Sequence, residues 1–381
     1  MKDRPIGIAV VGMGWMGFAH SRAYRQLNDR YHQCGIRPQL IVCADPVEAR
    51  AAEGKSRFGF QRATTDWREA VTAEDVQVVV VTTPNDGHLQ IVEAAAAAGK
   101  HITCEKPMGR TPHETARCYE AVQQAGTISG SGFNYRWVPV LQHARQLIAA
   151  GALGDITHCR ARYLEGYAQN PDDPMIWRFD QEIAGFGATG DMLSHATDLV
   201  LVMAGPIREL VAHRHTFIPK RPVAGEPAQV GQVTNEDYAS ALVVFENGAR
   251  GTLETCRVIK GPKSQFTVEV HGTRGALSWD FERMNEMQLF IPDDTTEHDG
   301  YVRIISGPDH RSHEHFTPAA AHGLGYEDLK VIESYEFLQT VVDGRQGDFG
   351  FNAALAVAEV HDAIGRSWES GGWEQVSRLT C

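Results

Sequence analysis

Length, composition and charge already restrict what this chain can be. Its 381 residues exceed one ordinary hydrophobic core, so we expect two domains, over residues 1–132 and 133–381. A hydrophobic share of 43% is that of a soluble globular protein, and a net charge of −12 argues against nucleic acid as a partner. The longest apolar run, residues 76–81, is far too short to span a membrane.

The cysteines and the N-terminus indicate a reducing compartment. The seven cysteines are odd in number, and no two of them form a C-x-x-C motif. This spacing argues for free thiols and against structural zinc. The first residues, MKDRPIGIAVV, lack the apolar stretch and cleavage site of an export signal. We therefore expect a cytoplasmic protein.

The first element in chain order is a buried strand over residues 6–11, followed by glycines at G-x-G-x-x-G spacing and a helix over 20–27. Gly12 permits the tight turn, Gly14 lets the backbone approach a pyrophosphate, and Gly17 lets the helix pack close to the strand. A glycine-rich turn without a ligand is the alternative, which the strand and the helix argue against. The cofactor contacts expected here are Gly12, Met13, Gly14, Trp15, Met16 and Gly17.

Asp45 stands at the end of the second predicted strand, residues 39–44. An acidic side chain at this position accepts hydrogen bonds from the adenosine ribose and repels a 2′-phosphate. The sequence therefore favours NAD over NADP, with an ordinary turn aspartate as the alternative.

Further strands over 76–81, 101–104 and 127–135 alternate with helices over 88–98 and 111–125. This alternation predicts a parallel, doubly wound Rossmann sheet, in which ligands bind at the carboxyl ends of the strands. The additional cofactor contacts expected at these ends are Thr82, Thr83, Pro84, Asn85, His88, Glu105 and Lys106.

The second half of the chain has a different pattern. A helix over 139–150, a strand over 155–164 and a helix over 188–203 come before successive strands between 207 and 290. Strands that follow one another without helices predict a large open, mostly antiparallel sheet. Two further helices are expected, over 326–342 and 352–367. The fold class is therefore α/β, a Rossmann domain followed by an α/β domain.

A nicotinamide cofactor implies hydride transfer, and an alcohol substrate must lose a proton in the same reaction. Asp191 and His195 are four residues apart on a predicted helix, so they can share a face and act as a carboxylate-supported base. Lys106, at a strand end, can polarise the reacting oxygen. Without a cofactor motif, such an Asp–His pair would more often be a structural hydrogen bond.

Other polar residues are candidates for ligand contacts. Those expected to contact the substrate, besides Lys106, Asp191 and His195, are Asn134, Tyr135, Arg136, Tyr163 and His322. Asn134, Trp177 and Arg178 are expected to contact the cofactor. Hydrogen bonds between domains and core packing are the alternative roles. The histidine-rich segment 310–322 has no metal-site spacing, so we assign no metal.

Four motifs in this order resemble the glucose-fructose oxidoreductase/inositol dehydrogenase family (Gfo/Idh/MocA): VGMGWMG, TTPNDGH, EKPMG and GDMLSHATD. The resemblance implies that Lys106 acts near the nicotinamide and the substrate. It also implies that Asp191 is a substrate ligand and His195 the catalytic acid/base. It further implies that the open sheet builds homodimers or homotetramers.

Finer features, including FNYRWVP and VTNEDYASALVVFENG, resemble the levoglucosan and inositol dehydrogenase branch. The implied reaction is NAD-dependent oxidation of a ring hydroxyl of a cyclic sugar or polyol, favouring the C3 hydroxyl of levoglucosan. The alternatives are an inositol or aldose dehydrogenase, a glycosidase that retains NAD, and a regulator that binds NAD without turnover. The presence of Lys106, Asp191 and His195 argues against the regulator.

Overall fold

The computed structural model describes residues 4–292 and 300–379, which divide into two compact units. The first unit contains the described residues up to 134 together with 324–355, and the second contains 135–323 and 356–379. The sequence analysis placed all residues after 132 in the second domain. The structure differs in that a C-terminal segment returns to the first unit.

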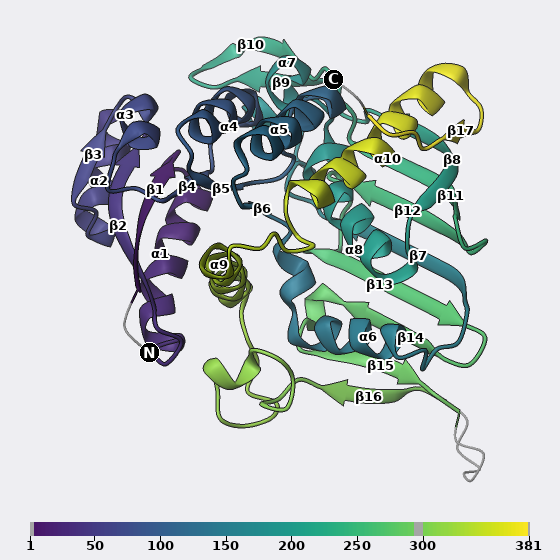
Figure 1. The fold of residues 1–381 in the computed structure, drawn as a ribbon. Coiled ribbons are helices and arrows are strands. Elements are labelled where there is room, and N and C mark those ends of the chain that lie inside the picture. Colours follow the sequence, from purple (N-terminus) through teal and green to yellow (C-terminus); the bar gives the residue numbers. More distant parts are fainter. Residues whose placement is uncertain (1–3, 293–299, 380–381) are drawn as a thin grey trace. The chain divides into compact units, whose positions relative to one another are not determined.

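Among the described residues, the first unit holds six parallel strands in the order β3-β2-β1-β4-β5-β6 (Figure 1). The strands are β1 (Arg4–Val11), β2 (Ile36–Ala44), β3 (Arg62–Thr64), β4 (Val78–Val81), β5 (His101–Cys104) and β6 (Ser129–Ser131). The order reverses between β1 and β4, which is where sheets of this kind bind ligands. The four valines of β4 have no exposed surface, as expected for a strand covered on both faces.

Helices connect these strands. They are α1 (Trp15–Arg30), α2 (Glu48–Phe58), α3 (Trp67–Thr72), α4 (His88–Ala97) and α5 (Pro112–Ala125). The predicted Rossmann domain is thereby confirmed. The first helix is longer than expected, and the segment after Pro46, for which the sequence analysis named no element, forms α2, β3 and α3.

The returning segment contributes α9 (Tyr326–Asp343), which packs along α1. Arg22 of α1 forms an ion pair with Glu327, its Nη2 lying 2.5 Å from Oε1. Tyr31 and Tyr335 stack with their ring centroids 3.9 Å apart. This helix is therefore a structural part of the dinucleotide-binding unit. After it, α10 (Phe351–Ser370) begins in the first unit and continues into the second.

The second unit is built on a large mixed sheet, whose nine strands within the described residues follow the order β16-β15-β14-β13-β7-β12-β11-β8-β17. Adjacent strands of this sheet run antiparallel, except that β7 and β12 run parallel to each other. The strands are β7 (Ile156–Leu164), β8 (Ile207–His215), β11 (Tyr238–Phe245), β12 (Arg250–Cys256), β13 (Gln265–Gly272), β14 (Ala276–Asp280), β15 (Glu286–Phe290), β16 (Val302–Ile305) and β17 (Glu374–Gln375). The predicted open, mostly antiparallel sheet is confirmed.

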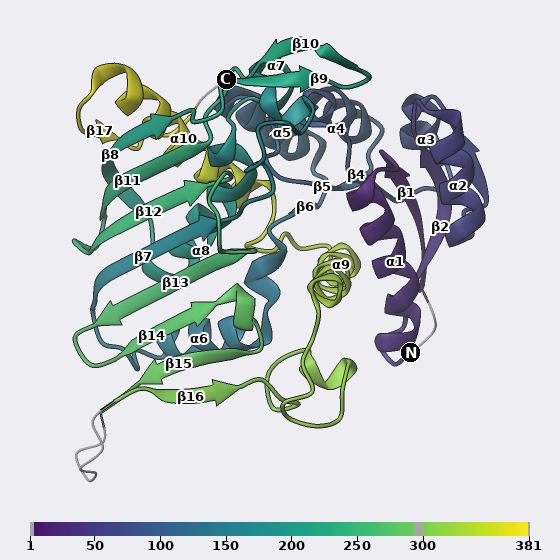
Figure 2. The same ribbon diagram turned by 180° about the vertical axis from the view of Figure 1, so that it is seen from behind.

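Helices α6 (Pro139–Ala149) and α8 (Ser194–Ala204) pack on one face of this sheet. Within the described part of the second unit, the opposite face carries no helix, as Figure 2 shows. A separate hairpin of β9 (Lys220–Val223) and β10 (Glu226–Gln232) and the short helix α7 (Gln181–Ala184) complete the unit. No helix of the described residues is both long and apolar enough to cross a membrane.

Two predicted elements differ in ways that matter for the site. The strand expected over 127–135 stops at Ser131, and a 3-10 turn, Asn134–Trp137, follows it. The helix expected over 188–203 begins with a π-helical turn, Thr189–Leu193, before α8. Asp191 therefore lies on a widened turn, a feature that is common at functional sites.

Candidate active site

The turn after β1 is shaped to approach a phosphate closely. Gly12 has a φ of +96°, and a Cβ atom there would lie 2.8 Å from the backbone of Thr82 and Thr83. A Cβ on Gly17 would lie 2.0 Å from the carbonyl oxygen of Gly12, so α1 packs directly on the turn. Gly14 has open space where its side chain would be, at the N-terminus of α1. This cradle fits a dinucleotide pyrophosphate.

Trp15 and Met13 occupy opposite environments in this turn. Trp15 is 62% exposed and stacks on Tyr326 of α9, with 5.6 Å between ring centroids. Met13 is buried beneath the turn, and Met16 is half-buried. Direct contact of these three side chains with the cofactor stays a prediction.

Asp45 follows β2 and is buried against the glycine turn. Its Oδ2 accepts a hydrogen bond from the backbone N–H of Met13 at 2.8 Å, and its Oδ1 accepts one from Val47 at 2.9 Å. Each carboxylate oxygen has a second lone pair for a ribose hydroxyl. Asp45 therefore joins the end of β2 to the phosphate cradle. Its contact with the adenosine ribose stays a prediction.

Several buried polar groups of the first unit have no hydrogen-bond partner among the described residues, and two of these groups follow strands of the sheet. They are the hydroxyl of Thr83, after β4, and the side-chain amide of Asn134, after β6. Unpaired buried polar atoms are costly, so such groups are expected where a ligand completes the bonding. Both residues were predicted to contact the cofactor, and their unpaired atoms fit its binding.

Lys106 lies on a turn after β5 that is anchored on both sides. On one side, His88 of α4 contacts the carbonyl oxygen of Pro107 at 3.0 Å through Nδ1 and that of Thr83 at 2.9 Å through Nε2. Burial lowers the pKa of His88 and so favours the neutral ring, which donates a hydrogen bond to only one of the two carbonyl oxygens. On the other side, the buried carboxylate of Glu105 contacts His20 and Lys330. The ring of His88 and the carboxylate of Glu105 thus bridge structural elements, and their contact with the cofactor stays a prediction.

The sequence analysis did not identify the partners of Glu105. His20, Glu105 and Glu333 place potential metal-ligand atoms within 4.8 Å of one another. The ammonium of Lys330, however, lies 2.7 Å from Glu105 and 3.0 Å from Glu333. A lysine therefore supplies the positive charge at this cluster. Lys330 lies more than 200 residues from Glu105 in the sequence, and no local pattern links the two.

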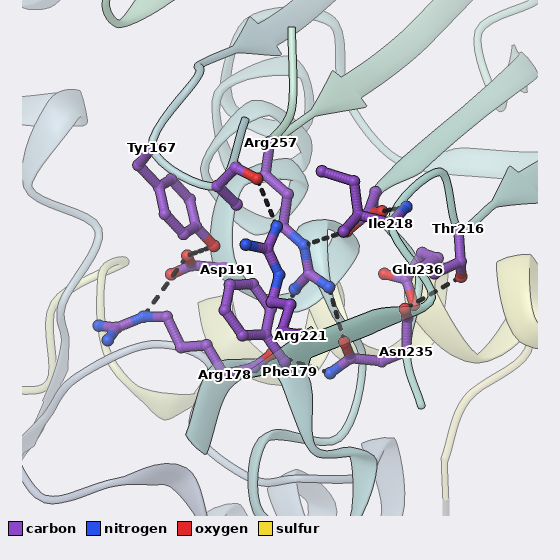
Figure 3. A network of polar contacts seen from close by, with 12 residues as sticks. Tyr167, Arg178, Phe179, Asp191, Thr216, Ile218, Arg221, Asn235, Glu236 and Arg257 are labelled. Atoms are coloured by element: carbon purple, nitrogen blue, oxygen red, sulfur yellow. Dashed lines mark hydrogen bonds and ion pairs between the residues drawn. The ribbon is translucent and has the colours of Figure 1, made fainter. Parts of the chain in front are cut away.

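In the second unit, Asp191 is held by two side chains (Figure 3). The hydroxyl of Tyr167 donates to Oδ2 of Asp191 at 2.9 Å, and Nε of Arg178 lies 3.6 Å from the same oxygen. Burial, and after it the Asp191 carboxylate, raise the pKa of Tyr167 well above its ordinary value, so its hydroxyl remains a donor. The sequence analysis missed Tyr167, whose loop carries no motif that marks it.

The backbone that carries Arg178 is fixed by a buried network (Figure 3). Its carbonyl oxygen accepts hydrogen bonds from Asn235 at 3.0 Å and from Arg257 at 3.1 Å. Arg257 is itself paired with Asp237, 2.8 Å from Nε to Oδ1. The guanidinium groups of Arg257 and Arg221 lie 4.8 Å and 4.3 Å from the centroid of the Phe179 ring. Arg178 is thus presented from a rigid support. Its guanidinium stacks on Trp177 at 4.4 Å.

His195 is buried among aromatic rings, two of which belong to predicted substrate residues. The ring of Tyr135 packs edge-on against that of His195 at 4.7 Å, and Tyr163 lies 6.3 Å away. The hydroxyls of Tyr135 and Tyr163 are 2.9 Å apart, and Tyr163 also contacts Ser264 at 3.1 Å. Burial raises the pKa of Tyr163, so the hydroxyl stays protonated. The structure thus brings Tyr135, Tyr163 and His195 together.

Two further predicted substrate residues, Arg136 and His322, lie elsewhere in the second unit. Arg136 forms a buried ion pair with Asp198 of α8, with Nε 3.0 Å from Oδ2. This pairing joins the turn after Asn134 to α8. His322 is exposed in the loop between β16 and α9. Their contact with substrate stays a prediction.

We predict that Asp45→Ala weakens NAD binding and narrows the preference for NAD over NADP by at least about tenfold. The charge that repels a 2′-phosphate is lost in this variant. The acceptor for the Met13 N–H is lost too, so the ratio of the two dissociation constants, measured by fluorescence titration, is the decisive quantity. The matched control is Asp86→Asn, which removes an exposed charge from a neighbouring turn. An unchanged ratio in Asp45→Ala would show that Asp45 does not read the ribose.

Comparisons with known proteins identify the family of this chain. Residues 6–133 match the model of the oxidoreductase family with an NAD-binding Rossmann fold, and residues 141–278 match the GFO/IDH/MocA C-terminal domain. Levoglucosan dehydrogenase of Pseudarthrobacter phenanthrenivorans is 34% identical over 98% of this chain and 99% of its own length. Inositol 2-dehydrogenase of Rhizobium meliloti is 25% identical over 95% of this chain and 96% of its own.

A solved structure of levoglucosan dehydrogenase in complex with NADH and levoglucosan covers 99% of this chain and 100% of its own, with a TM-score of 0.95 and 34% identity. The phosphate cradle fits a dinucleotide, and the family model and the NADH complex of the similar structure agree on NAD as the cofactor. The chain therefore belongs to the GFO/IDH/MocA family of NAD-binding oxidoreductases.

Proposed function

We propose that this protein oxidises a ring hydroxyl of a cyclic sugar with NAD, and that its substrate is levoglucosan, oxidised at C3 to the 3-keto form. The observation that carries the proposal is the similarity to levoglucosan dehydrogenase over 98% of the chain. The presence of Lys106, Asp191 and His195, which hydride transfer from an alcohol would use, supports it.

The roles follow from the chemistry of these side chains. A bound nicotinamide supplies the acceptor for the hydride from the substrate carbon. We assign removal of the hydroxyl proton to a ring nitrogen of His195, whose buried aromatic surroundings limit access of water. We assign Lys106 to the reacting oxygen, where its ammonium stabilises negative charge as the proton leaves. Asp191, held by Tyr167 and Arg178, accepts hydrogen bonds from substrate hydroxyls.

The proposed substrate is tested by an absorbance assay for NADH formation. The protein is mixed with NAD or NADP and, in turn, with levoglucosan, myo-inositol, scyllo-inositol, glucose and xylose. We expect rapid reduction of NAD with levoglucosan and at least about tenfold lower kcat/KM with the others, because a misplaced hydroxyl leaves polar groups of the site unpaired. Faster reaction with an inositol, which the inositol dehydrogenase relatives make the second candidate, would replace the substrate. No turnover with tightly held NAD would contradict the proposal.

The roles of Lys106 and His195 are tested by a double-mutant cycle. We predict that Lys106→Ala and His195→Ala each lower kcat by at least about 10²-fold, the usual loss when an acid–base group is removed. The double variant should lose much less than the product of the two effects, since both residues are assigned to one proton transfer. Lys55→Ala and His32→Ala, which change exposed residues, serve as controls. Wild-type turnover in a folded single variant would refute its role.

We further propose that the protein assembles as a homodimer or homotetramer through the uncovered face of the large sheet, in a reducing cytoplasm. Leu242 of β11 supports this assembly, because it is 54% exposed on that face while its neighbours in the strand are buried. The compartment is supported by the odd number and the scattered spacing of the seven cysteines.

We predict that light scattering gives two or four times the mass of one chain, and that Leu242→Glu lowers the mass by burying a charge at the interface. The control is Val47→Glu, at a residue of the first unit that is 46% exposed. A wild-type protein that is monomeric at micromolar concentration would contradict the proposed assembly.

A further inference from the structure

Four ionisable side chains meet in the interior of the first unit, and three elements supply them. His20 comes from α1, Glu105 follows β5, and Lys330 and Glu333 come from α9. None of the four is more than 7% exposed, and Lys330 has no exposed surface. Oε1 of Glu105 accepts hydrogen bonds from Nζ of Lys330 at 2.7 Å and from Nε2 of His20 at 2.8 Å.

The charges in this cluster depend on one another. Burial alone would raise the pKa of Glu105, but Lys330 and His20 outweigh it, so its pKa lies well below the usual value. Burial likewise opposes the charge on Lys330, yet the carboxylates of Glu105 and Glu333 raise its pKa above the usual value. Burial raises the pKa of Glu333. Glu105 and Lys330 therefore form an ionised pair.

The second oxygen of Glu105 connects this cluster to Lys106. Oε2 accepts the backbone N–H of Lys106 at 3.4 Å. On its other side this oxygen packs against Gly132, where a Cβ atom would lie 2.7 Å from it. The carboxylate therefore has little freedom to turn. One of its oxygens is held by Lys330, and the other contacts the backbone of the proposed catalytic lysine.

We propose that Lys330 is a positioning residue for the reaction, fixing the Lys106 turn through Glu105. The proposal rests on the proposed function in so far as Lys106 acts in turnover. Glu105 in this role keeps the start of the turn in place, while His88 holds its far side at Pro107. Helix α9, from the C-terminal part of the chain, thus stabilises the turn of Lys106 through the contact of Lys330 with Glu105.

The positioning is tested by hydrogen exchange, which does not depend on the substrate. In the full-length Lys330→Met variant we expect amides of the segment 104–110 to exchange at least about tenfold faster than in wild type. Lys330→Arg, which keeps the charge, should restore most of the protection. Leu329→Ala is the matched control, because it empties a fully buried position of the same helix without touching the ion pair. In Leu329→Ala we expect the exchange rates of amides in segment 104–110 to stay within about threefold of the wild-type rates.

The kinetic consequence is measured on the same variants. Lys330→Met should lower kcat at least about tenfold, while KM for the sugar and the dissociation constant for NADH change less than about threefold. Leu329→Ala should keep the wild-type kcat. If Lys330→Met does not fold, the Glu105→Gln/Lys330→Met double variant replaces it, since it also neutralises the buried carboxylate that lies nearest to the lost ammonium.

If a folded variant that lacks the Lys330 ammonium shows wild-type exchange rates in segment 104–110, the proposal is overturned. It is also overturned if Leu329→Ala accelerates exchange in this segment as much as Lys330→Met does. Faster exchange with an unchanged kcat would refute the catalytic relevance of the positioning. If the wild type oxidises none of the sugars, the proposed function fails. The exchange measurement then still decides whether Lys330 holds the Lys106 turn.

Discussion

The first unit depends on one buried ion pair, between Glu105 and Lys330. Glu105 follows β5, which lies next to the edge strand β6, whereas Lys330 comes from a helix near the other end of the chain. Ionised groups in a protein interior are tolerated only when they are paired and hydrogen-bonded. Glu105 and Lys330 meet this condition through each other and through contacts with His20 and Glu333. The pair therefore requires α9 to pack on α1, and it makes the dinucleotide-binding unit discontinuous in sequence.

In the second unit, a different set of contacts holds the backbone of a proposed ligand-binding residue in place. Arg178 reaches Asp191 from a single 3-10 turn, Trp177–Phe179, and so short an element needs further contacts to hold its backbone. Here the carbonyl oxygen of Arg178 is held by Asn235 and Arg257, and Arg257 is in turn paired with Asp237. In both units, then, a residue proposed to meet the ligand is carried by a backbone that buried charged groups fix in place.

Local patterns explain which features the sequence predicted. The glycine spacing around Gly12 and the alternation of strands and helices predicted the Rossmann sheet, because both are set by neighbouring residues. The motifs also placed Lys106, Asp191 and His195, whose roles stay predictions. Sequence patterns did not identify Lys330 or Tyr167, because their partners lie far away in sequence or in an irregular loop. The π-helical turn at Asp191 was missed too, since its residues have the composition of an ordinary helix.

Lys106 and Lys330 differ in burial, and this difference indicates different roles for the two side chains. Lys106 is partly exposed after β5, where an ammonium can reach a ligand, whereas Lys330 has no exposed surface and is paired with Glu105 and Glu333. A buried ion pair adds little net stability compared with apolar packing of the same volume. Such a pair does fix the orientation of its two side chains, because an ammonium and a carboxylate form short hydrogen bonds of defined geometry. The Glu105–Lys330 pair is therefore better explained by the geometry it gives the Lys106 turn than by the stability it adds.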